Sequence, residues 1–240
     1  MESRYDAADL VAEGGKYHLA VELPAAEAAR NISLTVTFGE EAEASLTLSL
    51  LKYATKLLAN STSQTEKTLV CDMLAYVKQA YAYFGSPDAT SVADAIDAII
   101  GNGATDFAKV DGTTTNMTTP ESVSFILDAE PKVRFYFAEG TSLESYSFKI
   151  SGETVSYTVT NKTVGENTFV CADISLFAYR MIDTVEVYLD GVKQGSFHIN
   201  SYYDFALTQN DNALVGVVER FYVYCKSAKA YRDEVIAGAN

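Results

Sequence analysis

The sequence predicts an α+β protein in which immunoglobulin-like antiparallel β-sandwich strands are followed by a helical hairpin, duplicated along the chain with an incomplete first copy. Three observations predict this fold. Apolar residues recur in the same order in residues 17–56 and 168–207. In both stretches they first alternate, as in half-buried strands, and then change to the spacing of an amphipathic helix. Further alternating segments precede only the second copy.

The strand part of the repeat follows a constant offset of 151 residues (168 − 17 = 151). Polar residues such as Thr35 and Glu186 lie between the matched apolar positions. A fixed offset that preserves the period of a strand indicates an internal repeat. The matched apolar pairs are Leu19–Val170, Leu23–Ile174, Leu34–Val185, Val36–Val187, Phe38–Leu189, Leu46–Phe197 and Leu48–Ile199.

A short helix and a longer helix are predicted after the strands of each copy. Ser63 and Glu66 have the spacing of a capping box at the start of the first long helix, and Gly85 ends that helix. Asp211 is the expected cap of the second long helix. The predicted apolar stripes are Leu69, Met73, Tyr76, Val77, Ala80 and Phe84 in the first copy, and Leu214, Val217, Val218, Phe221, Tyr224, Cys225, Ala228 and Tyr231 in the second.

The additional strands of the second copy make it large enough for a β-sandwich of immunoglobulin-like size. They are predicted over residues 121–127, 131–138, 145–150 and 153–160. Alternation places Val133, Phe135 and Phe137 on one face and Val155, Tyr157 and Val159 on another.

We expect the first repeat to span residues 1–111, with a partial sheet, a helical hairpin and a linking helix that Ser91 caps, and the second to span residues 112–240. The polar stretch 112–120 is the predicted linker. Counterparts of the leading strands would begin near position −31 (120 − 151) in the first copy, so we expect a fragment of a larger multidomain protein. The alternative is that residues 1–15 supply a degenerate edge strand.

Charge and composition exclude several classes of protein. The net charge of −14 disfavours binding to nucleic acid and to anionic membranes. The apolar runs are shorter than a membrane span, and no apolar signal segment follows Met1. Cys71, Cys171 and Cys225 show neither disulfide nor metal-site spacing, so we expect buried free thiols.

Motifs for catalysis, metals and cofactors are not found in the sequence. It contains no nucleophile elbow and no glycine-rich phosphate loop. His18 and His198 lie in predicted strands without a second ligand at metal spacing, and Glu40, Glu41 and Glu43 are expected in a solvated hairpin turn. We therefore expect a non-catalytic protein without cofactor or metal.

Tyrosines are the candidate binding residues. Tyr202, Tyr203, Tyr222 and Tyr224 cluster in the second helix pair, and Tyr224 repeats Tyr76, which favours a core position for it. Tyr202, Tyr203 and Tyr222 remain as candidates for contact with a partner, because tyrosine is enriched at protein interfaces. Of these, Tyr203 and Tyr222 are the freest by pattern, although core packing is the alternative for each aromatic. The absence of Trp weakens the case for sugar binding.

The stretch 69–76 (LVCDMLAY), which leads to Tyr83-Phe84-Gly85, resembles a module of large surface and secreted proteins of gut Firmicutes. Residues 133–137 (VRFYF), 178–185 (AYRMIDTV) and 196–202 (SFHINSY) also resemble it. The resemblance covers roughly residues 17–85 and 121–234 and implies tandem repeats of a β-sandwich with a helical hairpin. No functional residue can be transferred with it, because the shared pattern consists of core positions.

The resemblance implies that the protein is located outside the cell or on the cell wall. Such modules belong to adhesins, to immunoglobulin-binding proteins, or to proteins with carbohydrate-active domains. With the tandem repeat and the acidity, it favours a non-catalytic binding module for a host protein such as immunoglobulin. A carbohydrate-binding accessory module and a structural spacer are the alternatives, and an enzyme is the least favoured reading.

Overall fold

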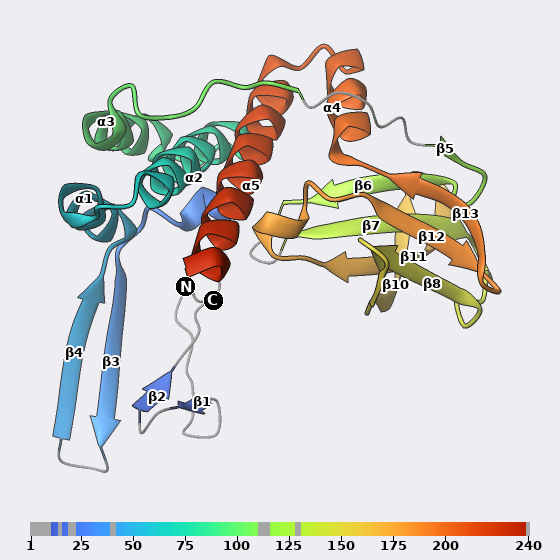
Figure 1. Cartoon of the computed structure of the whole chain (residues 1–240), viewed down its shortest axis with the longest axis horizontal. Helices are drawn as coiled ribbons and strands as arrows, with labels where there is room; N and C mark the ends of the chain where they lie inside the picture. The colour runs from blue at the N-terminus through green and yellow to red at the C-terminus, as the bar shows by residue number, and fades with distance from the viewer. Residues whose placement is uncertain are drawn as a thin grey trace.

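The computed structural model describes residues 11–13, 16–18, 23–38, 42–109, 116–127 and 131–238 of the chain. These residues form five α-helices and antiparallel β-sheets, which confirms the α+β class. In Figure 1, α2 (Gln64–Tyr83) and α5 (Asn212–Gly238) cross the centre of the molecule, between a β-hairpin on one side and the larger group of strands on the other.

The first half consists mainly of helices. Two hairpins, β1–β2 and β3–β4, accompany the helices α1 to α3, and the short 3-10 helix η2 packs against α2. The elements before α2 are β1 (Val11–Glu13), β2 (Lys16–His18), η2 (Ala25–Glu27), β3 (Ile32–Phe38), β4 (Ala42–Leu48) and α1 (Leu50–Asn60), and α3 (Ala89–Ile100) follows it.

The second half contains a four-stranded sheet of order β10-β11-β7-β6 and a five-stranded sheet of order β5-β13-β12-β8-β9. Their apolar faces pack together, with the ring of Phe135 on β7 5.0 Å from that of Phe148 on β8. The strands are β5 (Asn116–Met117), β6 (Ser122–Ile126), β7 (Lys132–Ala138), β8 (Tyr146–Ile150), β9 (Glu153–Val155), β10 (Thr158–Val164), β11 (Asn167–Ser175), β12 (Val185–Leu189) and β13 (Val192–Phe197).

The long helices α2 and α5 join the two halves in one core. They run antiparallel, since Ser63 at the start of α2 bonds Glu234 near the end of α5. Tyr76 and Ala80 of α2 belong to the same buried cluster as the sandwich residues. A smaller cluster, which includes Tyr81 of α2, holds η2, α1, α2 and α3 together. The remaining elements of the second half are η3 (Ala178–Arg180) and α4 (Ile199–Thr208).

The order of a 3-10 helix, two strands, a short helix and a long helix occurs in both halves. The alignment of these elements differs from the predicted offset of 151. β3 begins at Ile32 and β12 at Val185, which is an offset of 153 (185 − 32). The predicted partner of Val185 was Leu34, two residues further on. Side chains repeat every two residues in a strand, so the shift keeps the same face.

The predicted strand over residues 153–160 is wrong as a single strand. β9 pairs with β8 in one sheet, whereas β10 pairs with β11 in the other. Tyr157 lies between them, and its hydroxyl donates to the backbone oxygen of Leu143 at 2.7 Å. The chain thus changes sheet at this point. Val155 and Tyr157 both pack against the core, whereas Val159 on β10 is exposed and does not share their face, contrary to the prediction.

Helix boundaries agree with the sequence at two caps and differ at a third. The Ser63 hydroxyl accepts from the Glu66 amide at 3.1 Å, and Asp211 accepts from the amides of Ala213 and Leu214, so both residues are caps as predicted. The capping box is not complete, because the Ser63 amide donates to the Ser61 hydroxyl instead of the Glu66 carboxylate. Ser91, by contrast, lies inside the first turn of α3, where its hydroxyl donates to a backbone oxygen. The predicted hairpin turn at Glu40 and Glu41, residues 112–115 of the linker and most of residues 1–15 lie outside the described residues. Glu43, predicted in the same turn, lies instead in β4, and Asn116 and Met117 of the predicted linker form β5.

The three cysteines are buried free thiols, as predicted. Burial raises the pKa of each thiol, and for Cys71 the neighbouring carboxyl of Asp72 raises it further. In the part of the chain that the structure describes, no helix combines the length and the apolar character needed to cross a membrane.

Candidate functional site

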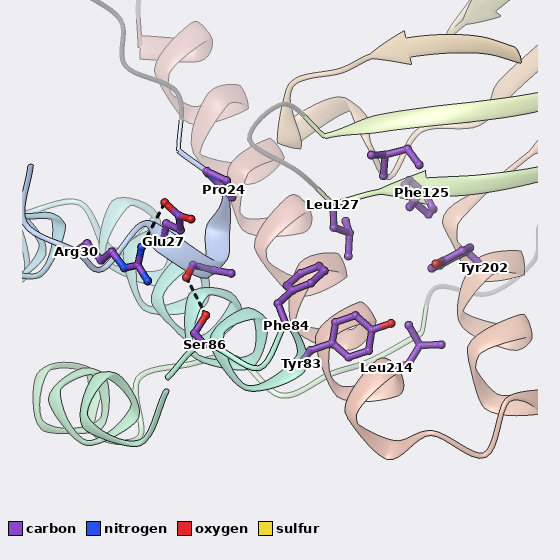
Figure 2. A pocket seen from close by; sticks show the side chains of 12 residues that line it. Pro24, Glu27, Arg30, Tyr83, Phe84, Ser86, Phe125, Leu127, Tyr202 and Leu214 are labelled. Carbon is purple, nitrogen blue, oxygen red and sulfur yellow. Dashed lines mark hydrogen bonds and ion pairs between the residues drawn. The ribbon is translucent and has the colours of Figure 1, made fainter. Parts of the chain in front are cut away.

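A cleft of about 550 Å³ lies where the first half meets the second, and we call it the aromatic cleft. Figure 2 shows its side chains, with η2 and the end of α2 on one wall and β6, α4 and α5 on the other. The residues that line it are Pro24, Ala26, Glu27, Arg30, Tyr83, Phe84, Ser86, Phe125, Ile126, Leu127, Tyr202 and Leu214.

The η2 wall is held against α2 by two hydrogen bonds. The amide of Ala29 donates to the Tyr81 hydroxyl at 3.2 Å in a buried position, and the Ser86 hydroxyl donates to the backbone oxygen of Ala26 at 3.2 Å. Arg30 and Glu27 form an ion pair of 3.6 Å at the edge of this wall (Figure 2). The wall therefore presents a charged, hydrogen-bonding pair to the cleft from a fixed backbone.

Tyr83 and Phe84 form the rim where α2 ends. Their rings meet edge to face, with centroids 5.0 Å apart. Gly85 has a φ of +67°, a conformation that glycine adopts without steric cost, and it turns the chain away from the helix axis. Phe84 is 49% exposed because it is the C-cap residue, and it is not in the core as its place in the apolar stripe predicted.

The opposite wall is built by Phe125 of β6, Tyr202 of α4 and Leu214 of α5. The ring of Tyr202 lies edge to face with Phe125, with centroids 5.1 Å apart. Burial raises the pKa of Tyr202, and the nearby Tyr83 adds to the effect. The Tyr202 hydroxyl therefore stays protonated at neutral pH and can both donate and accept a hydrogen bond.

The cleft combines apolar contact area with a few hydrogen-bonding groups. Aromatic rings line both walls and offer apolar contact area, while Arg30 and the tyrosine hydroxyls offer hydrogen bonds. Pockets of this kind take a mostly apolar group whose edge carries a few polar atoms. Within the described ranges, no group of three or more His, Cys, Asp or Glu side chains is placed to hold a metal ion.

Two of the three predicted tyrosines lie elsewhere. Phe107 packs against both Tyr203, at 4.7 Å between centroids, and Tyr222, at 5.7 Å. Tyr203 also donates to Glu219 at 3.0 Å and is half-buried. Tyr222 is only 2% exposed, so the expectation that it is among the freest tyrosines is wrong and its ring is a core contact. Tyr202 alone of the three lines the aromatic cleft.

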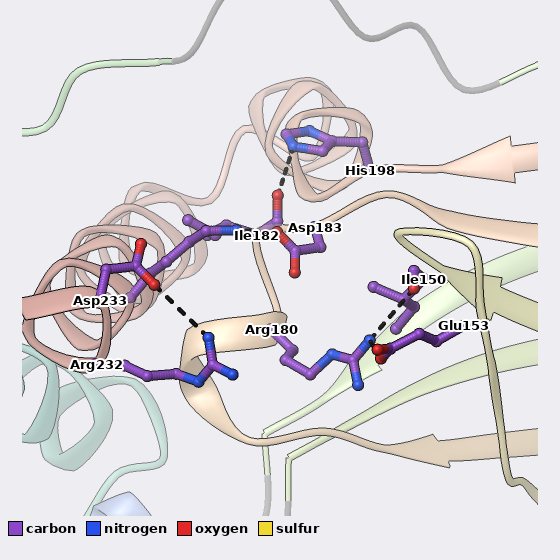
Figure 3. Close-up of polar contacts among 9 residues, drawn as sticks. Ile150, Glu153, Arg180, Ile182, Asp183, His198, Arg232 and Asp233 are labelled. Carbon is purple, nitrogen blue, oxygen red and sulfur yellow. Dashed lines mark hydrogen bonds and ion pairs between the residues drawn. The ribbon is translucent and has the colours of Figure 1, made fainter. Parts of the chain in front are cut away.

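A second group of polar contacts, at the junction of η3, α4 and α5, has a structural role (Figure 3). His198 is the N-cap residue of α4, and its Nδ1 accepts from the Asn200 amide at 3.1 Å. Its Nε2 must then carry the proton, which it donates to the backbone oxygen of Ile182 at 2.9 Å. Burial lowers the pKa of this imidazole. Both ring nitrogens are used by the fold, so His198 is not placed as a ligand.

Sequence reasoning missed Arg30, Glu27 and Phe125 as lining residues. Phe125 stands in a predicted strand and reads as a core residue. Glu27 ends the short 3-10 helix η2 and Arg30 lies in the turn after it, and this segment has no periodicity of its own. The available signal was the spacing of Glu27 and Arg30, which suits an ion pair one helical turn apart.

No protein-family model matches this chain, and neither the curated proteins nor the solved structures contain a match to it.

Proposed function

We propose that this chain is a non-catalytic binding module of a surface or secreted protein, and that the aromatic cleft receives part of a protein partner. The observation that carries the proposal is a preformed cleft lined by Tyr83, Phe84, Phe125 and Tyr202 beside a charged pair. Tyrosine, phenylalanine and arginine are the residue types enriched in the cores of protein interfaces.

We infer that the chain is a duplicated module and that the second half is an immunoglobulin-like sandwich followed by a helical hairpin. The repeated order of elements supports the duplication. So do equivalent backbone hydrogen bonds, in which the amides of Glu27 and Arg180 each donate to the residue three positions earlier. Two facing antiparallel sheets support the sandwich.

A host protein, with immunoglobulin as the first to test, is the proposed partner. The resemblance of residues 69–76 and 196–202 to modules of gut-bacterial surface proteins supports this choice. The net charge of −14 favours solubility and a selective partner over nonspecific binding to nucleic acid.

The experiment measures binding of pooled immunoglobulin, and separately of proteins from host secretions, to the immobilised chain. Phe84→Glu introduces a charge at the rim of the cleft, and Val164→Glu introduces the same charge at another exposed apolar residue, on β10. We expect Phe84→Glu to raise the Kd about 10-fold or more, equivalent to about 1.4 kcal/mol, and Val164→Glu to leave it unchanged. The proposal would be contradicted if the unaltered chain bound none of these proteins, or if both variants lost binding affinity equally.

A carbohydrate partner is the second candidate, because the rings of Tyr83, Phe84 and Tyr202 line the same cleft. A glycan array probed with the whole chain and with Phe84→Glu separates the two candidates. If the unaltered chain bound a class of glycans and Phe84→Glu did not, a carbohydrate-binding accessory module would be favoured. A chain that binds neither proteins nor glycans would fit the structural spacer.

A further inference from the structure

The hairpin β3–β4 has one face that is apolar along its whole described length. Ile32 pairs with Leu48, Leu34 with Leu46 and Val36 with Ala44. The other face carries hydroxyl groups, and Thr35 and Ser45 hydrogen-bond across it at 3.3 Å. Val36, Leu46 and Leu48 are 39%, 54% and 44% exposed, so the apolar face meets solvent. Two-stranded ribbons of this kind are normally covered on their apolar side.

A cavity of about 420 Å³ continues this face at the base of the hairpin. Ile32 and Leu48 belong to both the face and the cavity. The cavity is lined by Leu23, Ala28, Ile32, Leu48, Ser49, Leu50 and Tyr53, which are almost all apolar. We call the face and the cavity together the hairpin site, and it shares no lining residue with the aromatic cleft.

The second half shows which residues stand at the corresponding positions. β12 begins at Val185 where β3 begins at Ile32, and β13 ends at Phe197 where β4 ends at Leu48. The offset at the strand ends is 149 (197 − 48), and it also relates Tyr202 to Tyr53 (202 − 53). Val185 and Phe197 are 1% and 4% exposed, in contrast to Leu48.

The covering element in the second half is the sheet that contains β6 and β7. The ring of Phe125 on β6 lies 5.4 Å from Phe197 and 5.1 Å from Tyr202. Phe135 on β7 also contacts Phe197, at 6.2 Å. An aromatic side chain from a facing β-hairpin therefore fills the position that corresponds to the cavity beside Leu48 and Tyr53.

We propose that the hairpin site docks a β-hairpin of a partner polypeptide whose inward face alternates apolar residues and carries an aromatic ring that enters the cavity. Facing sheets of this kind pack about 10 Å apart through their side chains, so the partner needs no free strand edge of this chain. The partner completes a second, two-layered structure in the first half of the molecule, as β6 and β7 do in the second half. This inference is independent of what the aromatic cleft binds.

The probe is a fluorescent peptide of residues 121–138, which contains β6 and β7, closed by an added terminal disulfide to hold the hairpin. It is titrated against the full chain and followed by fluorescence anisotropy. We expect saturable binding. We also expect the same peptide with Phe125→Ser and Phe135→Ser to bind at least 10-fold more weakly, because it lacks the rings that fill the cavity.

Neighbouring residues on β4 supply matched variants of the protein. Leu46→Lys places a charge on the apolar face, whereas Thr47→Lys places the same charge on the opposite face of the strand. We expect a loss of peptide binding of 10-fold or more in Leu46→Lys and no change in Thr47→Lys. Val36→Lys is a second variant of the apolar face, and far-UV circular dichroism establishes that each variant is folded.

Three results would overturn the proposal. The first is no saturable binding of the peptide, and the second is equal binding by Leu46→Lys and Thr47→Lys. The third is a concentration-dependent dimer of the unaltered chain in analytical ultracentrifugation that Leu46→Lys abolishes, because a second copy would then be the occupant.

Discussion

The rings of Tyr76 on α2 and Tyr224 on α5 are stacked, with planes 7° from parallel and centroids 5.9 Å apart. They lie 148 residues apart in the sequence (224 − 76), and each belongs to the apolar stripe that was predicted for its helix. Phe221 completes the cluster at 5.2 Å from Tyr76. Burial raises the pKa of both tyrosines, to about 12 for Tyr224. The two long helices thus meet through a buried tyrosine contact.

The stacked pair predicts that the halves unfold together. Replacing Tyr76 by Ala removes a buried ring, and we expect the free energy of unfolding to fall by about 3–5 kcal/mol. Urea unfolding followed by circular dichroism measures the change. Tyr53→Ala, at an exposed position on α1, is the control and should change stability by about 0.5 kcal/mol or less. Two separate transitions in the unaltered chain would show that the halves are independent.

His198 predicts a loss of stability in mild acid. Its pKa in the folded chain is lowered by burial from the ordinary value of 6.5. As the pH falls below about 6.5, the unfolded chain gains a proton that the folded chain does not bind, so stability decreases until the pH reaches the folded pKa. His198→Asn keeps a good N-cap residue without a titrating group.

Stability measured in urea from pH 7.5 to 5 should therefore fall less in His198→Asn than in the unaltered chain. His18→Asn is the control, because the chain contains two histidines. If the pH dependence of stability remained in His198→Asn and disappeared in His18→Asn, the effect would come from His18, and the prediction would be wrong.

The hydrogen bonds of Asp72 lead us to expect that its replacement lets the segment around Thr105 open locally. Asp72 is fully buried on α2 and accepts from the Thr105 amide at 2.6 Å, from the Thr105 hydroxyl at 2.9 Å, and from the Ser227 hydroxyl of α5. Asp72→Asn has a single acceptor oxygen for these donors, and we expect a loss of about 1–3 kcal/mol and faster hydrogen exchange at the Thr105 amide. Ser227→Ala should cost about 1 kcal/mol and leave that amide protected. Unchanged exchange at Thr105 in Asp72→Asn would refute this account.

Arg134 and Asp173 form an ion pair between two strands, and we expect the effects of their substitutions on stability to be non-additive. Two hydrogen bonds of 2.6 Å join the guanidinium to the carboxylate between β7 and β11, and Asp173 is buried. Asp173→Ala leaves the arginine charge without its partner, and we expect a loss of about 3–5 kcal/mol. Arg134→Met with Asp173→Leu should recover most of that loss, because it removes both charges. A double variant as unstable as the sum of the single ones would refute the coupling.

The parts of the fold that local sequence determines were predicted correctly. Ser63 and Asp211 cap helices because their side chains reach amides two or three residues away, and that spacing is visible in the sequence. Strands such as β7 were predicted because every second residue is apolar. Helical spacing predicted Tyr76 as a core residue, and Tyr224 was predicted there as its repeat. Tyr76 is buried, and Tyr224 is half-buried against the core.

The parts of the fold that depend on contacts between residues distant in the sequence were not predicted correctly. The change of sheet near Tyr157 is set by its hydrogen bond to Leu143 and by the ring of Phe148, and alternation over residues 153–160 carries no sign of either. Tyr222 is buried by Phe107, which belongs to a segment without periodicity. The aromatic cleft combines η2 with β6 and α4, so only the packing of the two halves creates it.

Because their thiol pKa values are raised, the three cysteines can serve as probes of local opening of the structure. Alkylating reagents react with the thiolate, which burial disfavours at Cys71, Cys171 and Cys225. Each cysteine lies on a different element, namely α2, β11 and α5. The order in which mass spectrometry finds the three sites modified therefore ranks these elements by how often they expose their interior, without any engineered label.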